Sequence, residues 1–406
     1  MPRLILLLLL LILPAACNRQ SDPDPTGTYR GTITNPSTEQ VAFTLDIVRT
    51  RNTLSVALRN YDEILPASSV TQSGNTLKIR FDYYDATLDA SLAGDTLTGT
   101  FTRQWQKKTL TRTLTASRRP APESPIPSST NPSGDYILKV GTADNQKLWR
   151  AAFHANPATG AAHGTIIPLS GDWGAMSGSW SNNTLTLHRF DGINSRIIRL
   201  QSQSNGTLLG ELDLGLYDPK RPVIAERITD QNKDLVASLP DPKTYTRMKN
   251  PTEPFRFSFP DLAGKTLANT DFKGKPLLVT ITGSWCPNCH EEIPFLQSLY
   301  EKYHPQGLEI VALAFEYTGD PARDRQQLQL FADKYHVTFP LLLAGTTDDA
   351  PQKLPQLENF SAFPTTLFIG KDGLTKHIHA GFEGQATGTR FEKLKADTES
   401  LIKELL

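Results

Sequence analysis

Cysteine is scarce in this chain: only three of its 406 residues are cysteines, at positions 17, 286 and 289. This excludes a scaffold held together by several disulfides, so the folded regions must depend on packed apolar cores. A zinc site on Cys286 and Cys289 would need a second Cys or His pair at ligand spacing. The only close His pair, His377 and His379, follows an alternating apolar–polar pattern typical of a strand. We therefore predict no metal site.

The chain also lacks an excess of charge of either sign. Its 42 basic and 42 acidic side chains cancel at neutral pH. Proteins that bind nucleic acid usually present a basic face, so we predict no nucleic-acid partner. Long apolar runs are missing as well, apart from residues 4–13.

Residues 1–17 have the features of an export signal. Arg3 supplies a positive charge, the apolar run at 4–13 is too short to span a bilayer comfortably, and Pro14-Ala15-Ala16-Cys17 follows. This segment resembles the signal of bacterial lipoproteins, which implies cleavage before Cys17 and a lipid on that residue. Ordinary secretory cleavage is the alternative. We expect a chain of the cell envelope, anchored to the inner or outer membrane and facing the periplasm.

Proline-rich stretches divide the remainder. Five prolines lie within residues 119–132 and four within residues 240–254, as is typical of extended linkers. Alternating apolar residues before each linker favour strands, and alternating strand and helix patterns follow the second one. We predict a tether (18–26), a first β domain (27–118), a linker (119–132), a second β domain (133–239), a linker (240–252) and an α/β domain (253–406).

The two β-rich regions share sequence patterns. Gly27-Thr28-Tyr29 matches Gly134-Asp135-Tyr136 at a separation of 107 residues, and Leu77 and Leu185 lie in matching segments 108 residues apart. A near-constant offset predicts an internal duplication, each copy being a small antiparallel barrel or sandwich.

Neither copy shows a recognisable catalytic cluster. We interpret the scattered histidines as structural residues and the tryptophans as core or rim packing, with a ligand-binding surface as the alternative for the latter. These residues are His154, His163, His188, Trp149, Trp173 and Trp180.

The chemistry is predicted at the Cys286–Cys289 pair. Residues 277–282 are an apolar, β-branched run typical of a buried strand, and Gly283 and Ser284 end it. A helix is predicted to begin at the cysteines, with Pro287 near its first position. The helix N-terminus favours a thiolate on Cys286, the form that attacks disulfides, and Cys289 can then release the bound partner. A static disulfide is the alternative, but so short a loop would restrict the unfolded chain little.

The sequence from Trp285 to Pro294, with Phe363-Pro364-Thr365-Thr366 before a later strand, resembles the TlpA-like thiol:disulfide oxidoreductases. The resemblance implies a thioredoxin fold over residues 253–406 and a redox-active disulfide between Cys286 and Cys289 as the only redox group. It also implies a cis Pro364 against that disulfide and a backbone contact of Phe363 with the substrate. The predicted substrate groove consists of Trp285, Pro287, Phe363 and Pro364.

One departure concerns the buried acid of cytosolic thioredoxins, since Thr280 occupies its place. In the TlpA-like group a glutamate on the active-site helix replaces it, and Glu292 matches that position. Glu292 follows Cys289 by three residues and so shares its helix face, where it could accept the Cys289 proton. Glu291 points away and is expected to be solvated. His290 is expected to be an exposed, incidental residue, with electrostatic tuning of the cysteine pair as the alternative.

We therefore predict a thiol:disulfide oxidoreductase that exchanges disulfides with envelope proteins and is served by a membrane-side thiol electron donor. Reduction of partners is favoured over oxidation, because Pro287 and Asn288 place no cation between the cysteines. One alternative is a thiol peroxidase, whose motif would need Thr or Ser where this chain has Gly283. The other is a ligand-binding lipoprotein in which the redox domain is ancillary.

Overall fold

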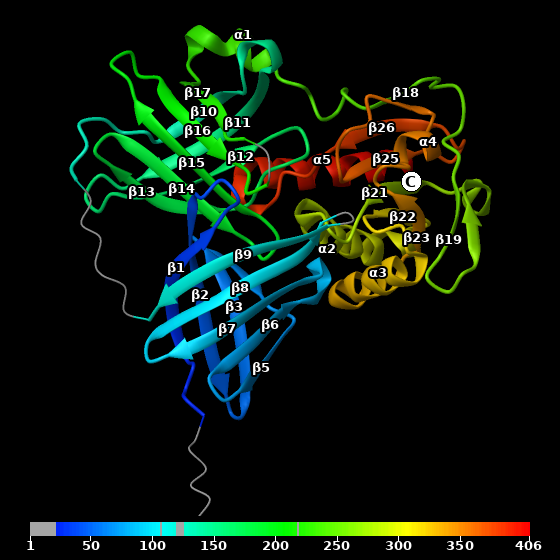
Figure 1. The fold of residues 1–406 in the computed structure, drawn as a ribbon. Coiled ribbons are helices and arrows are strands. Elements are labelled where there is room, and N and C mark those ends of the chain that lie inside the picture. The colour runs from blue at the N-terminus through cyan, green and yellow to red at the C-terminus, as the bar shows by residue number, and fades with distance from the viewer. Residues whose placement is uncertain (1–21, 106–107, 119–125, 217–218) are drawn as a thin grey trace, which may run out of the picture.

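The computed structural model describes residues 22–105, 108–118, 126–216 and 219–406, and forms three domains that meet at one junction (Figure 1). The predicted export signal with Cys17, part of the tether and half of the first linker (119–125) lie outside the described residues. Within the described part of the chain, no helix combines the length and the apolar character needed to cross a membrane.

The first β domain is a nine-stranded antiparallel sheet in the order β4-β3-β2-β1-β9-β8-β7-β6-β5. One face of each long strand is buried, as on β2, where Val41, Phe43, Leu45 and Ile47 all point inward. The strands are β1 (Gly27–Thr34), β2 (Gln40–Thr50), β3 (Thr53–Asn60), β4 (Glu63–Pro66), β5 (Ser69–Ser73), β6 (Thr76–Phe81), β7 (Ala86–Ala93), β8 (Thr96–Trp105) and β9 (Lys108–Ser117).

One strand of this domain is shorter than the sequence pattern predicts. The alternation suggests that the strand continues through Tyr83, but β6 ends at Phe81 and the 3-10 turn η1 (Asp82–Tyr84) follows. Asp85 closes the turn with a left-handed backbone conformation (φ 49°). The turn therefore projects Tyr83 and Tyr84 towards the C-terminal domain.

The second β domain is a closed antiparallel barrel in which each strand pairs with the next and β17 pairs with β10. Apolar side chains fill its interior, including Trp180, as expected for core packing. Trp149 and Trp173 pack on each other at the edge of this core. The strands are β10 (Gly134–Val140), β11 (Lys147–Ala155), β12 (Ala161–Ile167), β13 (Met176–Ser181), β14 (Thr184–Phe190), β15 (Ser195–Ser202), β16 (Leu208–Asp213) and β17 (Arg221–Arg227), with η2 (Ala143–Asn145) between β10 and β11.

The two β domains begin and end alike. Tyr29 on β1 and Tyr136 on β10 are both buried, and an arginine from the end of the domain lies over each ring, 5.6 Å away for Arg118 and 5.1 Å for Arg227. In both domains the last strand returns to pair with the first. The first sheet is open between β4 and β5, whereas the second is closed, so the duplication stays a prediction.

The β domains share an apolar core. Phe190, Ile193 and Ile197 of the second domain belong to the same buried cluster as the core of the first. Asn60 exchanges two hydrogen bonds with the Phe190 backbone, at 3.0 and 3.2 Å. His188 accepts a hydrogen bond from the backbone N–H of Ala42. The two domains are therefore packed as one body.

The C-terminal domain has a five-stranded sheet in the order β23-β22-β21-β25-β26, with β25 and β26 antiparallel to their neighbours. Helices α2, α3 and α5 pack around it (Figure 1). Its elements are β18 (Arg247–Met248), β19 (Ser258–Pro260), β20 (Thr266–Ala268), η4 (Asn269–Phe272), β21 (Leu277–Thr282), α2 (Pro287–Tyr303), η5 (His304–Gln306), β22 (Glu309–Glu316), α3 (Pro321–Tyr335), β23 (Leu341–Thr346), α4 (Ala350–Lys353), β24 (Leu357–Glu358), β25 (Thr365–Ile369), β26 (Thr375–Ala380), η6 (Gln385–Thr387) and α5 (Thr389–Leu405). His377 and His379 lie on β26, as the alternating pattern indicates.

The segment between the β domains and the C-terminal domain contains η3 (Asp230–Asn232) and the short helix α1 (Lys233–Ala237). No residue from 228 to 240 is buried. The chain then joins the C-terminal domain, since the Pro242 carbonyl accepts from the Ala380 N–H and β18 pairs with β24.

Candidate active site

The cysteine pair stands at the junction of a buried strand and a helix, as the sequence predicts. All six residues of β21 are buried. Cys286 is the N-cap of α2, and its Sγ accepts a hydrogen bond from the Cys289 N–H at 3.3 Å. Pro287 occupies the first turn, where its missing N–H costs no helical hydrogen bond. The helix dipole and the free N–H groups there favour negative charge on Cys286.

Both cysteines are free thiols and buried: Cys286 is 4% exposed and Cys289 is fully covered. Burial raises the pKa of the Cys289 thiol well above its usual value. Cys286 Sγ lies 3.4 Å from the carbonyl oxygen of Phe363, and the Phe363–Pro364 peptide bond is cis. The structure thus brings the cysteines and the predicted groove residues Phe363 and Pro364 together.

Glu292 lies beneath the pair, in the interior of the C-terminal domain. Its two carboxylate oxygens accept hydrogen bonds from Thr280 Oγ1 at 2.6 Å and Thr366 Oγ1 at 2.7 Å. Burial raises the pKa of Glu292 to about 7, against the opposing effect of these hydroxyls. Thr280, which replaces the acid of cytosolic thioredoxins, is therefore a direct partner of the glutamate on the helix.

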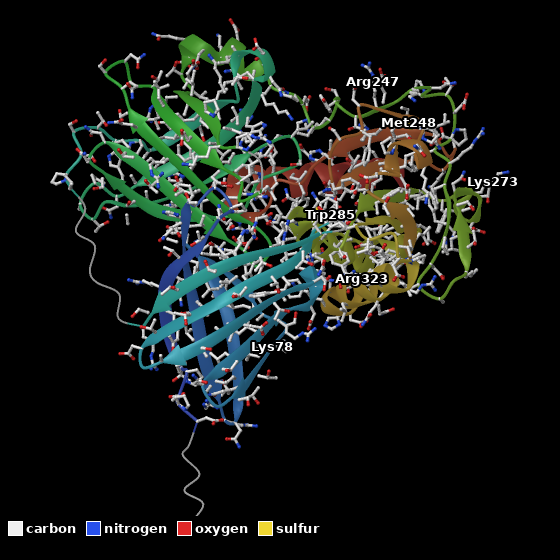
Figure 2. The ribbon with its side chains drawn as sticks, in the orientation of Figure 1. Lys78, Arg247, Met248, Lys273, Trp285 and Arg323 are labelled. Atoms are coloured by element: carbon white, nitrogen blue, oxygen red, sulfur yellow. The ribbon has the colours of Figure 1, made fainter. Side chains whose placement is uncertain are left out.

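Trp285 forms the wall beside the cysteines and lies where the three domains meet (Figure 2). Its indole N–H donates to the Phe315 carbonyl at 2.8 Å, and its ring stacks on Tyr317 at 4.4 Å and packs edge-on against Phe363 at 5.3 Å. Pro287 is partly exposed on the other side of Cys286. These contacts fix the turn that presents the cysteine.

Sequence reasoning missed a second buried acid, Glu316 at the end of β22. Its carboxylate accepts from the N–H of Ser284 at 2.8 Å and from the Ser284 hydroxyl at 2.6 Å. Burial raises the pKa of Glu316 to about 7. The signal that could have indicated Glu316 is an acidic residue at the end of β22, the buried strand next to β21. Glu316 holds the turn immediately before Cys286.

The prediction for His290 is wrong. Its side chain is buried rather than exposed, and its ring nitrogens contact the Tyr335 hydroxyl and the Ser284 carbonyl oxygen, each at 2.7 Å. Burial lowers the pKa of His290 well below its ordinary value. The covering residues Tyr83 and Tyr84 come from the first β domain, so the helix alone gave no sign of this environment.

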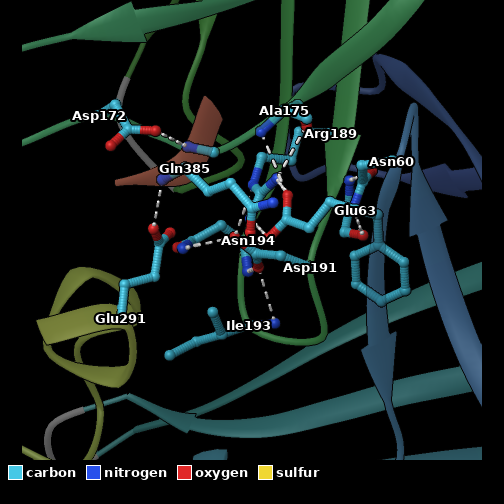
Figure 3. Close-up of polar contacts among 12 residues, drawn as sticks. Asn60, Glu63, Asp172, Ala175, Arg189, Asp191, Ile193, Asn194, Glu291 and Gln385 are labelled. Atoms are coloured by element: carbon cyan, nitrogen blue, oxygen red, sulfur yellow. Dashed lines mark hydrogen bonds and ion pairs between the residues drawn. The ribbon is translucent and has the colours of Figure 1, made fainter. Parts of the chain in front are cut away.

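The prediction of a solvated Glu291 is also wrong. It faces the second β domain, and its carboxylate accepts from the Gln385 N–H at 3.2 Å (Figure 3). Burial, together with the carboxylates of Asp172 and Glu63, raises the pKa of Glu291 to about 8. Arg189 joins this cluster and donates to Glu63 at 3.0 Å. Glu291 thus lies half-buried at the domain junction.

The described residues contain no group of three or more His, Cys, Asp or Glu side chains arranged to hold a metal ion. The groups that the structure brings together at this site are two thiols at a helix N-terminus and nearby buried carboxyl groups.

Comparison with known proteins agrees with this geometry. Residues 252–378 match the AhpC/TSA family model. The chain is 31% identical over 125 residues to the thiol-disulfide oxidoreductase ResA of Geobacillus thermodenitrificans. The aligned region covers 31% of this chain and 66% of that protein. The chain is 30% identical over 125 residues to the thioredoxin-like protein YneN of Bacillus subtilis, covering 31% of this chain and 68% of YneN. A crystal structure of a thiol:disulfide interchange protein DsbE from Chlorobium tepidum aligns with 38% of this chain and 99% of its own, at 17% identity and a TM-score of 0.31.

The residues that the family model matches, 252–378, lie in the C-terminal domain apart from the first. The chain spans slightly less than two thirds of the length of the first of these relatives. Through its C-terminal domain, the chain belongs to the thioredoxin-like family of thiol:disulfide oxidoreductases.

Proposed function

We propose that this chain is a thiol:disulfide oxidoreductase that exchanges disulfides through Cys286 and Cys289. The observation that carries the proposal is the position of Cys286 at the N-cap of α2 with the Cys289 N–H on its sulfur. That arrangement stabilises the attacking thiolate and holds the second thiol within reach of it.

The reaction has two exchange steps. The Cys286 thiolate attacks a partner disulfide, forms a mixed disulfide and releases one partner thiolate. Cys289 then gives its proton to Glu292 and attacks the Cys286 sulfur, which releases the second partner thiolate and forms the Cys286–Cys289 disulfide. The partner gains two electrons, and the chain must recover them from a thiol donor. We favour this reductive direction because no cation stands between the cysteines.

Glu292 suits the role of proton acceptor because its pKa of about 7 lies near the working pH. Cys289 needs such an acceptor, since burial strongly favours its neutral thiol. The groove beside Cys286, formed by Trp285, Phe363 and Pro364, offers an apolar surface for the partner chain.

Exchange activity of the full chain on a disulfide-containing protein such as insulin tests the proposal. Cys286→Ser should abolish turnover, and Cys289→Ser should stop it after formation of a mixed disulfide. Full turnover by Cys286→Ser would contradict the assignment.

The AhpC/TSA match raises a thiol peroxidase as the second candidate. That chemistry would need Thr or Ser in place of Gly283, but a Cβ there would lie 2.3 Å from Trp285 Nε1 and 2.7 Å from the Phe315 carbonyl oxygen. The turn thus has no room for a larger residue while Trp285 keeps its position. Peroxide consumption comparable to disulfide exchange would reverse this preference.

We propose further that the chain works in the cell envelope on disulfide-bearing proteins, anchored through a lipid on Cys17. The support is the N-terminal sequence alone. Cys17→Ala should move the protein from the membrane fraction to the soluble fraction, and unchanged membrane retention would contradict the anchor.

A further inference from the structure

A turn of the first β domain covers the helix that carries the cysteines. The rings of Tyr83 and Tyr84 lie 5.5 and 4.6 Å from the ring of His290, the residue after Cys289. The Lys334 ammonium of α3 lies 3.3 Å from the centre of the Tyr83 ring. Tyr83 and Tyr84 are both buried. The turn therefore packs closely against α2 and α3.

Polar contacts fix the edges of the same turn. Gln327 of α3 donates to the Asp82 carbonyl, and Arg323 of α3 pairs with Asp85 (Figure 2 labels Arg323). We call residues 82–85 the gate turn.

Little space remains between the gate turn and Ser284-Trp285, the two residues that precede Cys286. The gate turn and Gln104 on one side, and Ser284, Trp285 and Tyr317 on the other, enclose a crevice of about 20 Å³. That is room for about one water molecule. On the far side of Cys286, the Asn288 amide donates to the Ser170 carbonyl of the second β domain at 2.9 Å. Cys286 itself is only 4% exposed, so a protein disulfide cannot reach its sulfur while the β domains stay docked.

The covering body and the covered domain have separate cores. The two β domains share one apolar cluster that includes Phe190. The two apolar clusters of the C-terminal domain contain no residue before Met248. Interfaces without a shared apolar core permit relative motion of domains.

The connection between these bodies is loosely packed. No residue from 228 to 240 is buried, and a cavity of about 500 Å³ lies beneath α1, lined by Arg150 of the barrel and by Glu383 and Arg390 of the C-terminal domain. The contact of Gly171 with Phe382 lies next to this cavity. The first β domain contacts the C-terminal domain through the gate turn, which lies at the end of its strands beside α2 and α3 (Figure 1).

We infer that the gate turn determines which disulfides reach Cys286: seated on α2 and α3 it excludes protein-sized partners, and it must lift from α3 to admit them. This inference rests on the proposed function only in taking Cys286 as the reacting thiol. Small disulfides need the gate turn to open only slightly, whereas large disulfides need it to separate fully from α3. The stability of the docked gate turn therefore sets the selectivity between small and large disulfides.

The test measures access and not turnover. In a full-length Cys17→Ser/Cys289→Ser background, Cys286 is the only thiol. Its labelling rates with iodoacetamide and with a maleimide carrying a long polyethylene glycol chain are compared as a ratio. Arg323→Glu/Gln327→Glu places negative charge against Asp85 and the Asp82 carbonyl. Because like charges in contact oppose docking, we expect the bulky reagent to gain on the order of tenfold over the small one.

Two further variants control the result. Arg325→Glu reverses one charge on the same helix, as Arg323→Glu does, but Arg325 donates to the Leu262 carbonyl within its own domain, so its ratio should match the parent. Adding Asp85→Arg to Arg323→Glu restores an ion pair and should bring the ratio back towards the parent value. The inference is contradicted if the parent labels equally fast with both reagents relative to a free thiol. It is also contradicted if the Arg323→Glu/Gln327→Glu variant is folded and keeps the parent ratio. If the labelling ratios are as expected but the chain exchanges no disulfides, the proposed function is contradicted and the inference about the gate turn is not.

Discussion

The two faces of helix α2 differ in what they contact. One face carries Cys289 and Glu292 and packs into the C-terminal domain, where the Glu292 carboxylate accepts hydrogen bonds from two threonine hydroxyls. The other face carries Asn288 and Glu291 and meets the second β domain. Burial raises the pKa of both adjacent glutamates, and the Asp172 and Glu63 carboxylates add to the rise at Glu291 alone. We propose that only Glu292 serves the thiols.

The largest expected difference between these faces is catalytic. Glu292→Gln keeps the side-chain shape but removes the base, so resolution of the mixed disulfide by Cys289 should slow by about 10²–10⁴-fold. Attack by Cys286 should persist, because the helix N-terminus does not depend on the glutamate. Rapid-mixing kinetics of mixed-disulfide formation and decay measure both steps.

Glu291→Gln is the matched control on the other face and should leave resolution within a few-fold of wild type. If Glu291→Gln is the slow variant, or if neither variant is slow, the role assigned to Glu292 is wrong.

A smaller effect should follow from the threonine partners of Glu292. The Thr280 hydroxyl lowers the pKa of Glu292, so Thr280→Val should raise it. The pH at which resolution accelerates should then move upward by about one unit. Thr365→Val is the control, because that hydroxyl donates to the Ala362 carbonyl and not to Glu292. An unshifted pH profile in Thr280→Val would show that Glu292 does not govern this step.

The smallest effect concerns pH at the junction face. In the closed arrangement the pKa of Glu291 is raised to about 8 from an ordinary 4.5, so closing takes up a proton between these values. Closure should therefore weaken as pH rises through this window and be weakest above it. Asp172, whose pKa burial raises to about 6, acts in the same direction, while Glu63 and the Arg189 guanidinium also face the site.

The measurement is the bulky-to-small labelling ratio of Cys286, in which the ionisation of the thiol itself cancels. The ratio should rise several-fold between pH 6 and pH 9, roughly the scale expected for a partly exposed group. Glu291→Gln should flatten the upper part of the rise, and Glu301→Gln, on the exposed surface of α2, should not. If the labelling ratio rises with pH as much in Glu291→Gln as in the parent, Glu291 does not cause the pH dependence of closure.

Local signals predicted the core of the site. The apolar run at 277–282, the Gly283-Ser284 break and Pro287 locate the strand, turn and helix, because each acts through its own backbone. The spacing from Cys289 to Glu292 works for the same reason, since a helix fixes which residues share a face.

The failures have a tertiary cause. His290 and Glu291 stand on a helix whose outer side would be solvated in an isolated domain, but the β domains cover it. Tyr83 follows the strand alternation in sequence, yet the chain turns at Asp82 to meet α3. No periodic pattern encodes a contact between domains, so these features could not be predicted from spacing.

The most direct test of the central claim is the mixed disulfide itself. Cys289→Ser and Cys286→Ser full-length proteins are each incubated with an oxidised partner, quenched with acid and mapped by mass spectrometry. We expect Cys289→Ser to accumulate a partner bound through Cys286 and Cys286→Ser to accumulate none, because Cys289 is buried and its thiol neutral. A partner trapped on Cys289, or no trapped partner in either variant, would contradict it.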